Sequence, residues 1–569
     1  MRSQNNDNNS IQKIRTYLTG LEGFGFSGAV LVAKNGKVLV ESYHGLANKS
    51  KRIPAREDTI FGTGSVTKQF TGAAILALES DGKLRVTDPI SKYLDNVPED
   101  KAGITIHHLL THTSGLATGF GGDYERVSRD DLVRRAMSSE LLSPPGTRHA
   151  YSNAGYSLAA AIVEIVSGKS IDGFSRERLF LPAGMTSTGY FFPQETADRL
   201  ARGYRDGVDS ERTEKKAALD GDLWNLLGNG GVYSTLGDMH KWMIALEQGK
   251  VLSNEAREKF FHPQQLAIAN YRNSGHPLYY SYGWYVWKQP SGKTLTWHLG
   301  GDGTENFAVR WHKDDRRLVI YASNVSEFHD PLYPVPAIER VLEGENVKMP
   351  PPVRSLAAKT MMKYSGRYRG DSGAVLSVEA KDSFLELQGE GQEAFALVTS
   401  RKWQKEAKQE ELNKRTAEAV ESSRTGRYET LLGLFGQNIT IERLGEFERL
   451  FWKKRHDLHG DYVGARVLGT RPATRGYLGT TVVAIDFERG TTYREYFWSS
   501  DGRIGDLGPI NSPPSMKYFP ISDKCFAAFE PAQAVLTSLC FENAAGAGIG
   551  ETAMRLDNGI KLQKVSVAK

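Results

Sequence analysis

The segment Ser65-Val66-Thr67-Lys68 places a hydroxyl and an amine three positions apart in the chain. On a helix that begins at Ser65, the two side chains share a face, so the lysine amine lies within reach of the serine hydroxyl. A serine hydroxyl needs a neighbouring base to act as a nucleophile, and a buried lysine can supply one because desolvation disfavours its charged form. The pattern indicates nucleophilic catalysis, but a serine N-cap followed by a surface lysine has the same spacing.

Two later segments carry groups that the same chemistry would use. Tyr151-Ser152-Asn153 follows a turn-rich stretch and precedes an apolar helix, so it presents a phenol and an amide at a helix start. The alternative is structural, with Ser152 or Asn153 capping the helix and Tyr151 in the core. His298 lies on a predicted strand that runs into glycines, where a ligand can approach the backbone closely. Taken alone, His298 is typical of a core histidine with its hydrogen bonds satisfied.

The order and spacing of these three motifs resemble the serine β-lactamase and penicillin-binding-protein superfamily. The pattern is most similar to the group that contains class C β-lactamases, D-aminopeptidases, DD-carboxypeptidases and related esterases. The stretches ITIHHLLTHTSGL and GNGGVYSTLGDMHKW support the resemblance, which covers roughly residues 20–345. It implies that Ser65 is the acyl-accepting nucleophile, activated by Lys68. It also implies that Tyr151 is a general base and then the acid that protonates the leaving group, and that Asn153 holds Lys68 and the amide of the substrate.

The resemblance gives the third motif a substrate-binding role, at His298 and Gly300. The oxyanion hole would consist of the backbone N–H groups of Ser65 and Gly301. This motif departs from the common Lys-Thr-Gly, because His298 replaces the lysine and Leu299 replaces the hydroxyl residue. Histidine is mostly neutral at pH 7, so this position need not supply a positive charge to bind a carboxylate of the substrate. Both changes argue against efficient β-lactam turnover and leave acyl transfer itself untouched.

The resemblance therefore predicts a serine hydrolase that cleaves an amide or ester bond through an acyl-enzyme. A D-amino-acid peptidase, a carboxypeptidase or a carboxyl esterase, acting on a small molecule or a peptide, fits best. One alternative is a β-lactamase with modest turnover. Another is a non-catalytic penicillin-binding sensor or scaffold, because the long C-terminal extension carries no recognisable catalytic cluster and could bind a partner.

The elements that must position these residues fit one α+β domain over residues 1–348. Strand patterns flank Asn35-Gly36, a strong hairpin signal, and return between about residues 281 and 324, so distant parts of the chain complete one sheet. A buried helix is predicted from Ser65 to near Gly82, and another from Val335 to Leu342. Helical patterns dominate the insertion at about 86–285, as in a β-lactamase/transpeptidase-like fold.

The remaining chain is predicted to form β-rich and α+β modules. A Pro-rich linker at 349–354 can continue neither a helix nor a sheet. It precedes a small antiparallel β module at 355–400, which could be a barrel of the kind that follows the catalytic domain in D-aminopeptidases. A charged helix is expected at 401–424, and an α+β domain at 425–569.

Composition excludes several classes. The net charge of +5 over 569 residues does not indicate a nucleic-acid partner, and no apolar stretch is long enough for a membrane span. No cofactor or metal is expected, because His108 and His112 lack the intervening glutamate of a zinc motif. A homo-oligomer is compatible with the sequence. The chain as written suggests a cytoplasmic protein, or a periplasmic or secreted one if it is a trimmed mature form; the sequence leaves open whether Cys525 and Cys540 form a disulfide.

Overall fold

The computed structural model describes residues 2–205, 207–217, 221–325, 333–370, 374–390, 392–399, 406–435, 439–472, 478–499, 501–510, 513–530, 535–543, 552–556 and 561–565. The chain forms two compact units, an N-terminal unit (Met1–Val347) and a C-terminal unit (Lys348–Lys569). Each unit is described by itself.

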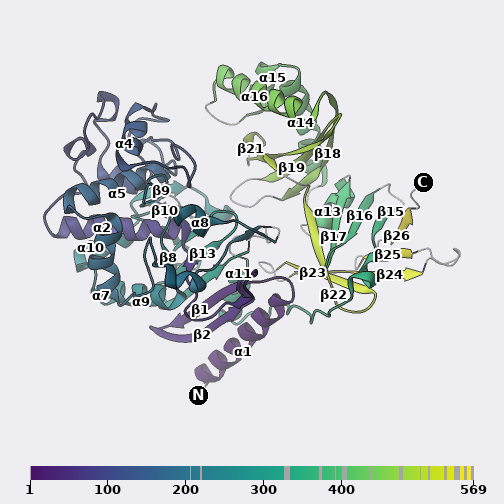
Figure 1. Cartoon of the computed structure of the whole chain (residues 1–569), viewed down its shortest axis with the longest axis horizontal. Helices are drawn as coiled ribbons and strands as arrows, with labels where there is room; N and C mark the ends of the chain where they lie inside the picture. The colour runs from purple at the N-terminus through teal and green to yellow at the C-terminus, as the bar shows by residue number, and fades with distance from the viewer. Residues whose placement is uncertain are drawn as a thin grey trace. The chain divides into compact units, whose positions relative to one another are not determined.

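An eight-stranded antiparallel sheet runs through the N-terminal unit (Figure 1) in the order β2-β1-β14-β13-β12-β11-β10-β9. Asn35 and Gly36 join β1 to β2 with φ angles of 53° and 76°, which confirms the predicted hairpin. Because β1 pairs with β14, the start and end of the unit complete one sheet, as predicted. The strands are β1 (Gly28–Lys34), β2 (Lys37–His44), β9 (Gln265–Ile268), β10 (Leu278–Tyr280), β11 (Tyr285–Lys288), β12 (Thr294–Gly301), β13 (Asn306–His312) and β14 (Arg317–Ser323).

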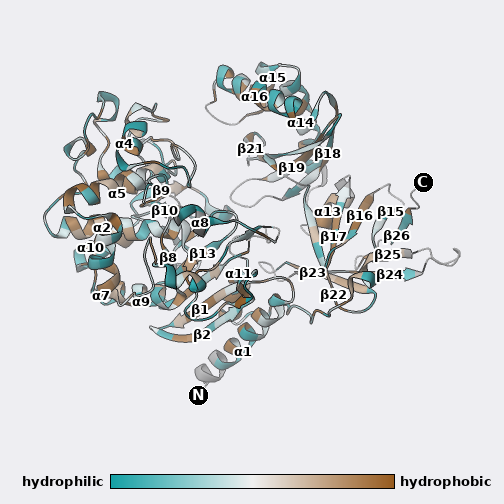
Figure 2. Cartoon of the chain, in the orientation of Figure 1, coloured by the Kyte–Doolittle hydropathy of each residue, from teal (hydrophilic) through white to brown (hydrophobic). Residues whose placement is uncertain are grey.

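Helices pack on both faces of this sheet, because successive side chains along a strand point to opposite sides. Leu31 of β1 belongs to the core that contains Leu76 of α2 and Leu158 of α5, and Figure 2 shows α5 as mainly hydrophobic. Arg310 of β13 donates from Nε to Glu339 of α11 at 2.8 Å. The helices are α1 (Arg2–Glu22), α2 (Lys68–Ser80), α3 (Ile106–Leu110), α4 (Arg129–Ser138), α5 (Asn153–Ser167), α6 (Ile171–Ser175), α7 (Leu181–Ala183), α8 (Arg212–Ala217), α9 (Leu236–Glu247), α10 (Asn254–Phe261) and α11 (Val335–Leu342).

Two features of this unit differ from the sequence-based expectation. Sequence analysis assigns no element to the residues before β1, where the structure has α1. This helix buries Ile14, Tyr17, Leu18 and Leu21, which have the one-sided spacing of an amphipathic helix. The segment at 86–285 is not all-helical, since β9 and β10 extend the sheet and β8 (Tyr233–Ser234) pairs with β5 (Phe61–Gly62). Strands of two to four residues are too short to show a clear period-two pattern.

The C-terminal unit contains a closed eight-stranded barrel (Figure 1). Sequence analysis places residues 355–400 and 425–569 in separate modules, but both segments contribute to this one barrel. β15, β16 and β17 from the first segment are followed by β22 to β26 from the second, with β17 paired to β22 and β15 closing the barrel against β26. Pairing between strands that lie far apart in the chain leaves no local pattern in the sequence, which explains why the sequence analysis divides the barrel into two modules. The strands are β15 (Gly366–Gly370), β16 (Val375–Ala380), β17 (Leu385–Glu390), β22 (Ser515–Pro520), β23 (Cys525–Glu530), β24 (Val535–Asn543), β25 (Thr552–Leu556) and β26 (Lys561–Val565).

A helical and four-stranded part is inserted between β17 and β22. The predicted charged helix corresponds to α14 (Glu406–Arg424); residues 401–405 of that prediction lie outside the described residues. The other elements are α12 (Ala358–Met362), which precedes the barrel, then α13 (Gln392–Thr399), α15 (Tyr428–Leu434), α16 (Ile441–His459), β18 (Tyr462–Pro472), β19 (Gly479–Phe487), β20 (Gly490–Trp498) and β21 (Ile504–Ile510). Inside it, both guanidinium Nη atoms of Arg494 donate to the carboxylate of Glu448, and both residues are fully buried.

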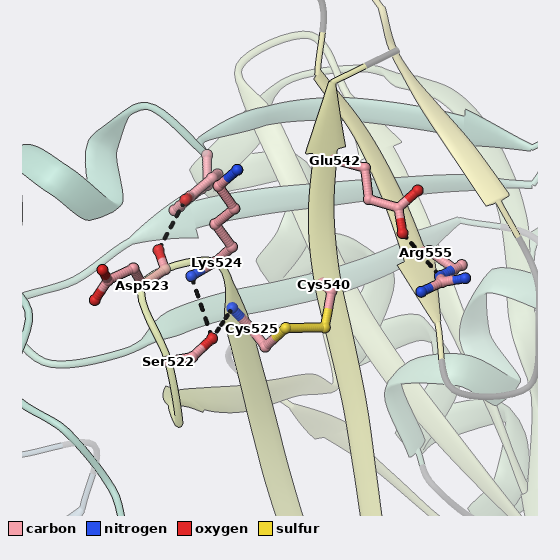
Figure 3. Close-up of a disulfide and its surroundings, with 8 residues drawn as sticks. Ser522, Asp523, Lys524, Cys525, Cys540, Glu542 and Arg555 are labelled. Carbon is pink, nitrogen blue, oxygen red and sulfur yellow. Dashed lines mark hydrogen bonds and ion pairs between the residues drawn. A yellow bond between two sulfur atoms is a disulfide. The ribbon is translucent and has the colours of Figure 1, made fainter. Parts of the chain in front are cut away.

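A disulfide joins two neighbouring strands of the barrel (Figure 3). Cys525 of β23 lies directly opposite Cys540 of β24 in the antiparallel register, and the two sulfur atoms are bonded. The sequence leaves open whether the two cysteines are bonded, and the strand register shows that they lie opposite each other.

Throughout the residues that the structure describes, no helix has both the length and the apolar character required to cross a membrane.

Candidate active site

Ser65 lies on a short 3-10 turn, Gly64–Thr67, directly before α2. The helix therefore begins at Lys68 and not at Ser65 as predicted. The turn starts from Gly64, whose φ of +49° is in the left-handed region that favours glycine. Despite this shift, Lys68 Nζ lies 3.0 Å from Ser65 Oγ, so the predicted hydroxyl–amine pair is formed.

Lys68 is fully buried and contacts three oxygen atoms. Its Nζ lies 2.8 Å from Asn153 Oδ1 and 2.8 Å from the backbone oxygen of Asn229, in addition to Ser65 Oγ. Both 2.8 Å partners are carbonyl oxygens that can only accept, so they take the two hydrogens of a neutral amine and leave its lone pair facing Ser65. Burial lowers the pKa of Lys68 well below its usual range, and the carboxylate of Asp123 opposes this shift.

Tyr151 lies beside this pair at the start of α5. Ser152 is the N-cap of the helix and accepts from the backbone N–H of Gly155 at 3.1 Å, which frees Asn153 to face Lys68. Lys68 Nζ lies 4.9 Å from the centroid of the Tyr151 ring. Burial raises the pKa of the Tyr151 phenol, and a hydrogen bond with Ser65 acts in the opposite direction. Tyr151 is therefore a phenol at neutral pH.

His112 supports Tyr151 and was not predicted to have this role. Its ring lies 4.2 Å from the Tyr151 ring, and its Nδ1 accepts from the backbone N–H of Ser152 at 3.0 Å. Sequence analysis considers His112 only as a weak metal ligand with His108. In the structure His108 caps α3 instead, with Nδ1 accepting from the N–H of Thr105. The motif THTSGL contains His112, but its spacing gives no sign of the contact.

The end of β12 packs directly against the Ser65 turn. A Cβ added to Gly300 would lie 2.0 Å from the oxygen of Thr63 and 2.6 Å from the nitrogen of Ser65, so only glycine permits this approach. A Cβ on Gly64 would lie 2.7 Å from the nitrogen of Gly301. These contacts bring the N–H groups of Ser65 and Gly301 to one place, where the oxyanion hole is predicted.

His298 lies on the same strand but is 1% exposed. Its Nδ1 lies 2.7 Å from the backbone oxygen of Leu299, and its Nε2 lies 3.1 Å from Tyr280 Oη. Since the carbonyl can only accept, Nδ1 carries the proton and Nε2 accepts from the tyrosine. Burial, with a smaller contribution from Lys68, lowers the pKa of His298 to about 3. The imidazole is neutral at pH 7, and its ring nitrogens are both occupied.

A cavity of about 80 Å³ opens beside Ser65. Asn153 and Gly301 line it, whereas Lys68, Tyr151, His298 and Gly300 are not among its described lining residues. Four charged groups that the sequence analysis did not single out also line it: Asp123, Arg212, Asp302 and Glu305. Glu305 comes five residues after Gly300, the end of the His298 motif, in the stretch GDGTEN, where no recognised pattern indicates a function.

Residues 21–335, more than half of the chain, match the family described as Beta-lactamase. Penicillin-binding protein 4* of Bacillus subtilis (strain 168) is 30% identical over 404 residues, which are 66% of this chain and 86% of that protein. Teichoic acid D-alanine hydrolase of Staphylococcus aureus is 27% identical over 301 residues, 53% of this chain and 70% of that protein. The solved octameric penicillin-binding protein homologue from Pyrococcus abyssi has a TM-score of 0.53 and 18% identity, over 97% of this chain and 100% of that chain.

The fold and these matches define a β-lactamase/transpeptidase-like protein followed by a β-rich C-terminal unit. The chain belongs to the Beta-lactamase family, whose members are serine acyl-transfer hydrolases and penicillin-binding proteins.

Proposed function

We propose that this protein is a serine hydrolase that cleaves an ester or amide of a D-amino acid through an acyl-enzyme on Ser65. The observation that carries the proposal is the arrangement of Lys68, whose Nζ lies 3.0 Å from Ser65 Oγ and 2.8 Å from each of two carbonyl oxygens. In the neutral amine these carbonyls take both hydrogens, which directs the lone pair at Ser65. A hydroxyl paired with a neutral amine is an activated nucleophile.

In acylation, Ser65 Oγ attacks the carbonyl carbon of the substrate, and its proton moves to Lys68 Nζ. The carbonyl oxygen becomes an oxyanion and accepts from the N–H groups of Ser65 and Gly301, where one such donor contributes roughly 10²–10³ in rate. The intermediate collapses when the bond to the leaving group breaks. The leaving group takes a proton from the Tyr151 phenol, and the proton on Lys68 replaces it. Serine is then esterified.

In deacylation, water attacks the Ser65 ester and the same groups move the protons in reverse. Lys68 accepts a proton from the water, the ester bond breaks, and Ser65 Oγ regains its proton. The products are a free carboxylic acid and the restored serine. The raised pKa of Tyr151 and the lowered pKa of Lys68 favour Lys68 as the base and the phenol as the proton donor only, whereas the resemblance implies that Tyr151 acts first as the base.

The surroundings of His298 favour substrates without a carboxylate at this position. A neutral, hydrogen-bonded imidazole and the aliphatic Leu299 offer such a carboxylate no cation. β-Lactams and peptides with a free C-terminus carry that group. An ester or amide of a D-amino acid need not, and the similarity to the teichoic acid D-alanine hydrolase of Staphylococcus aureus supports this substrate class.

The test compares Ser65→Ala with a control, Ser291→Ala, at an exposed turn. The wild type and the control should turn over p-nitrophenyl esters or D-alanine p-nitroanilide and be labelled by a fluorophosphonate, whereas Ser65→Ala should do neither. Turnover retained in Ser65→Ala would rule the mechanism out. A wild-type protein that is labelled but turns over no substrate would indicate a sensor. A wild-type protein that hydrolyses nitrocefin as fast as the p-nitrophenyl ester would indicate a β-lactamase.

A further inference from the structure

Glu305 is the unusual group in the cavity beside Ser65. The residue is 3% exposed, and its Oε1 has no hydrogen-bond partner among the described residues. Its other oxygen lies 3.6 Å from Nη1 of Arg212, and the backbone N–H of Gly62 also interacts with the carboxylate. Burial raises the pKa of Glu305 to about 7, against the lowering effect of Arg212 and of the Gly62 N–H. A cation bound at the unused Oε1 would stabilise the charged carboxylate, which otherwise costs free energy in this buried place.

The charges around Glu305 leave the cavity acidic. Asp123 and Asp302 also line it, while Arg212 is the one cation among its described lining residues, and it forms an ion pair with Asp302 as well. Lys216 is not among the described lining residues, and its Nζ donates to the backbone oxygen of Gly231 at 2.6 Å. Its charge also acts on Glu305, but burial lowers the pKa of Lys216 to about 7, which weakens that effect at neutral pH. Three carboxyl groups against one guanidinium favour a cationic ligand and disfavour an anionic one.

The position of the cavity indicates which part of a substrate it receives. The leaving group must lie at its proton donor, and Tyr151 and Lys68 are absent from the described lining. Ser65, Asn153 and Gly301 are present, so the cavity holds the part of the substrate that stays on Ser65, the acyl group. About 80 Å³ has room for a few water-sized groups at roughly 10–15 Å³ each, which is the size of a single small aminoacyl group.

We propose that Glu305 binds an ammonium group on the acyl part of the substrate, so that the preferred substrates are aminoacyl esters or amides with a free amino group. The inference rests on the proposed function and narrows it, since it names the chemistry that Glu305 recognises. An N-acylated amino acid offers no charge to Glu305, and it adds bulk to a small cavity. The acidic cavity then favours substrates that carry an ammonium group, and the neutral His298 disfavours substrates that carry a carboxylate.

The experiment compares two substrates in one protein, D-alanine p-nitroanilide and N-acetyl-D-alanine p-nitroanilide, at neutral pH. The ratio of their kcat/KM values is the measurement, because a loss of folded enzyme cancels in it. We expect the wild type to prefer the free amine, and Glu305→Gln to lower the ratio about 10- to 100-fold, as for loss of a charged hydrogen bond. Glu305→Asp should retain part of the preference, and the exposed control Glu99→Gln should retain all of it.

Two results would overturn the inference while leaving the proposed function intact. One is a wild type that hydrolyses both p-nitroanilides equally, which needs no variant and so does not depend on the folding of Glu305→Gln. The other is a Glu305→Gln protein that is labelled at Ser65 and keeps the wild-type ratio. If the wild type hydrolyses no ester or anilide and Ser65 takes no fluorophosphonate, the proposed function itself fails.

Discussion

Replacing Gly300 by alanine tests the contact between β12 and the Ser65 turn. The added Cβ would lie 2.0 Å from the oxygen of Thr63, and an ordinary contact begins at 3.4 Å, so strand and turn must separate by about 1.4 Å (3.4 − 2.0). A misplacement of about 1 Å can reduce the rate by about 10²-fold, and loss of one oxyanion donor costs about 10²–10³-fold. We expect kcat to fall by about 10²–10³-fold.

The assay is kcat on a p-nitrophenyl ester, with the rate of fluorophosphonate labelling and the Tm measured on the same protein. Gly103→Ala is the matched control, because a Cβ at Gly103 meets no atom within 4 Å. The control should keep the wild-type kcat. A Gly300→Ala protein with wild-type kcat and Tm would refute the reasoning, because the strand and turn would then not be in contact.

Three further predictions concern single groups. Tyr151→Phe should slow p-nitroanilide hydrolysis by about 10²–10⁴-fold and p-nitrophenyl ester hydrolysis less, because p-nitrophenolate leaves without a proton; equal losses would contradict the acid role. Burial alone would raise the pKa of Glu339, but Arg310 and His312 lower it overall. Its contribution to stability is therefore present above the ordinary carboxyl pKa and lost as the pH falls toward the lower folded value. Glu339→Gln should lower the free energy of unfolding at pH 7 by about 3 kcal/mol and flatten its acid dependence in urea titrations. Replacing both members of the Cys525–Cys540 pair by serine, at a sequence separation of 15, should cost the C-terminal unit about 3 kcal/mol with kcat unchanged; an unchanged unfolding midpoint would contradict this.

The sequence predicts the parts of the site that are local. The Ser65–Lys68 spacing fixes two side chains within one turn, although that turn is 3-10 and not α-helical. The hairpin at Asn35-Gly36 is specified by two residues that accept positive φ. These features depend on neighbours in the chain, so a pattern reveals them.

The parts that the sequence does not predict arise from close approach between distant segments. The partner of Lys68 at Asn229 is a backbone oxygen, which any residue could supply. The ring contact between His112 and Tyr151 joins segments 39 positions apart (151 − 112), and Glu305 reaches the cavity from beyond the last motif. The pairing of β15 with β26, which closes the barrel, also joins distant segments, so the structure shows it and the sequence does not.

Burial favours the neutral forms of four groups near Ser65, and this has a consequence for the proton that Ser65 gives up. The four groups are Lys68, His112, Tyr151 and His298. Burial is the first cause of the lowered pKa values of Lys68, His112 and His298, and a positive charge on Lys68 lowers the latter two further. When Lys68 takes the proton, it becomes the only cation in this group, and the neighbouring imidazoles do not compete with it for the oxyanion. The ammonium can then return the proton through Tyr151 as the leaving group departs.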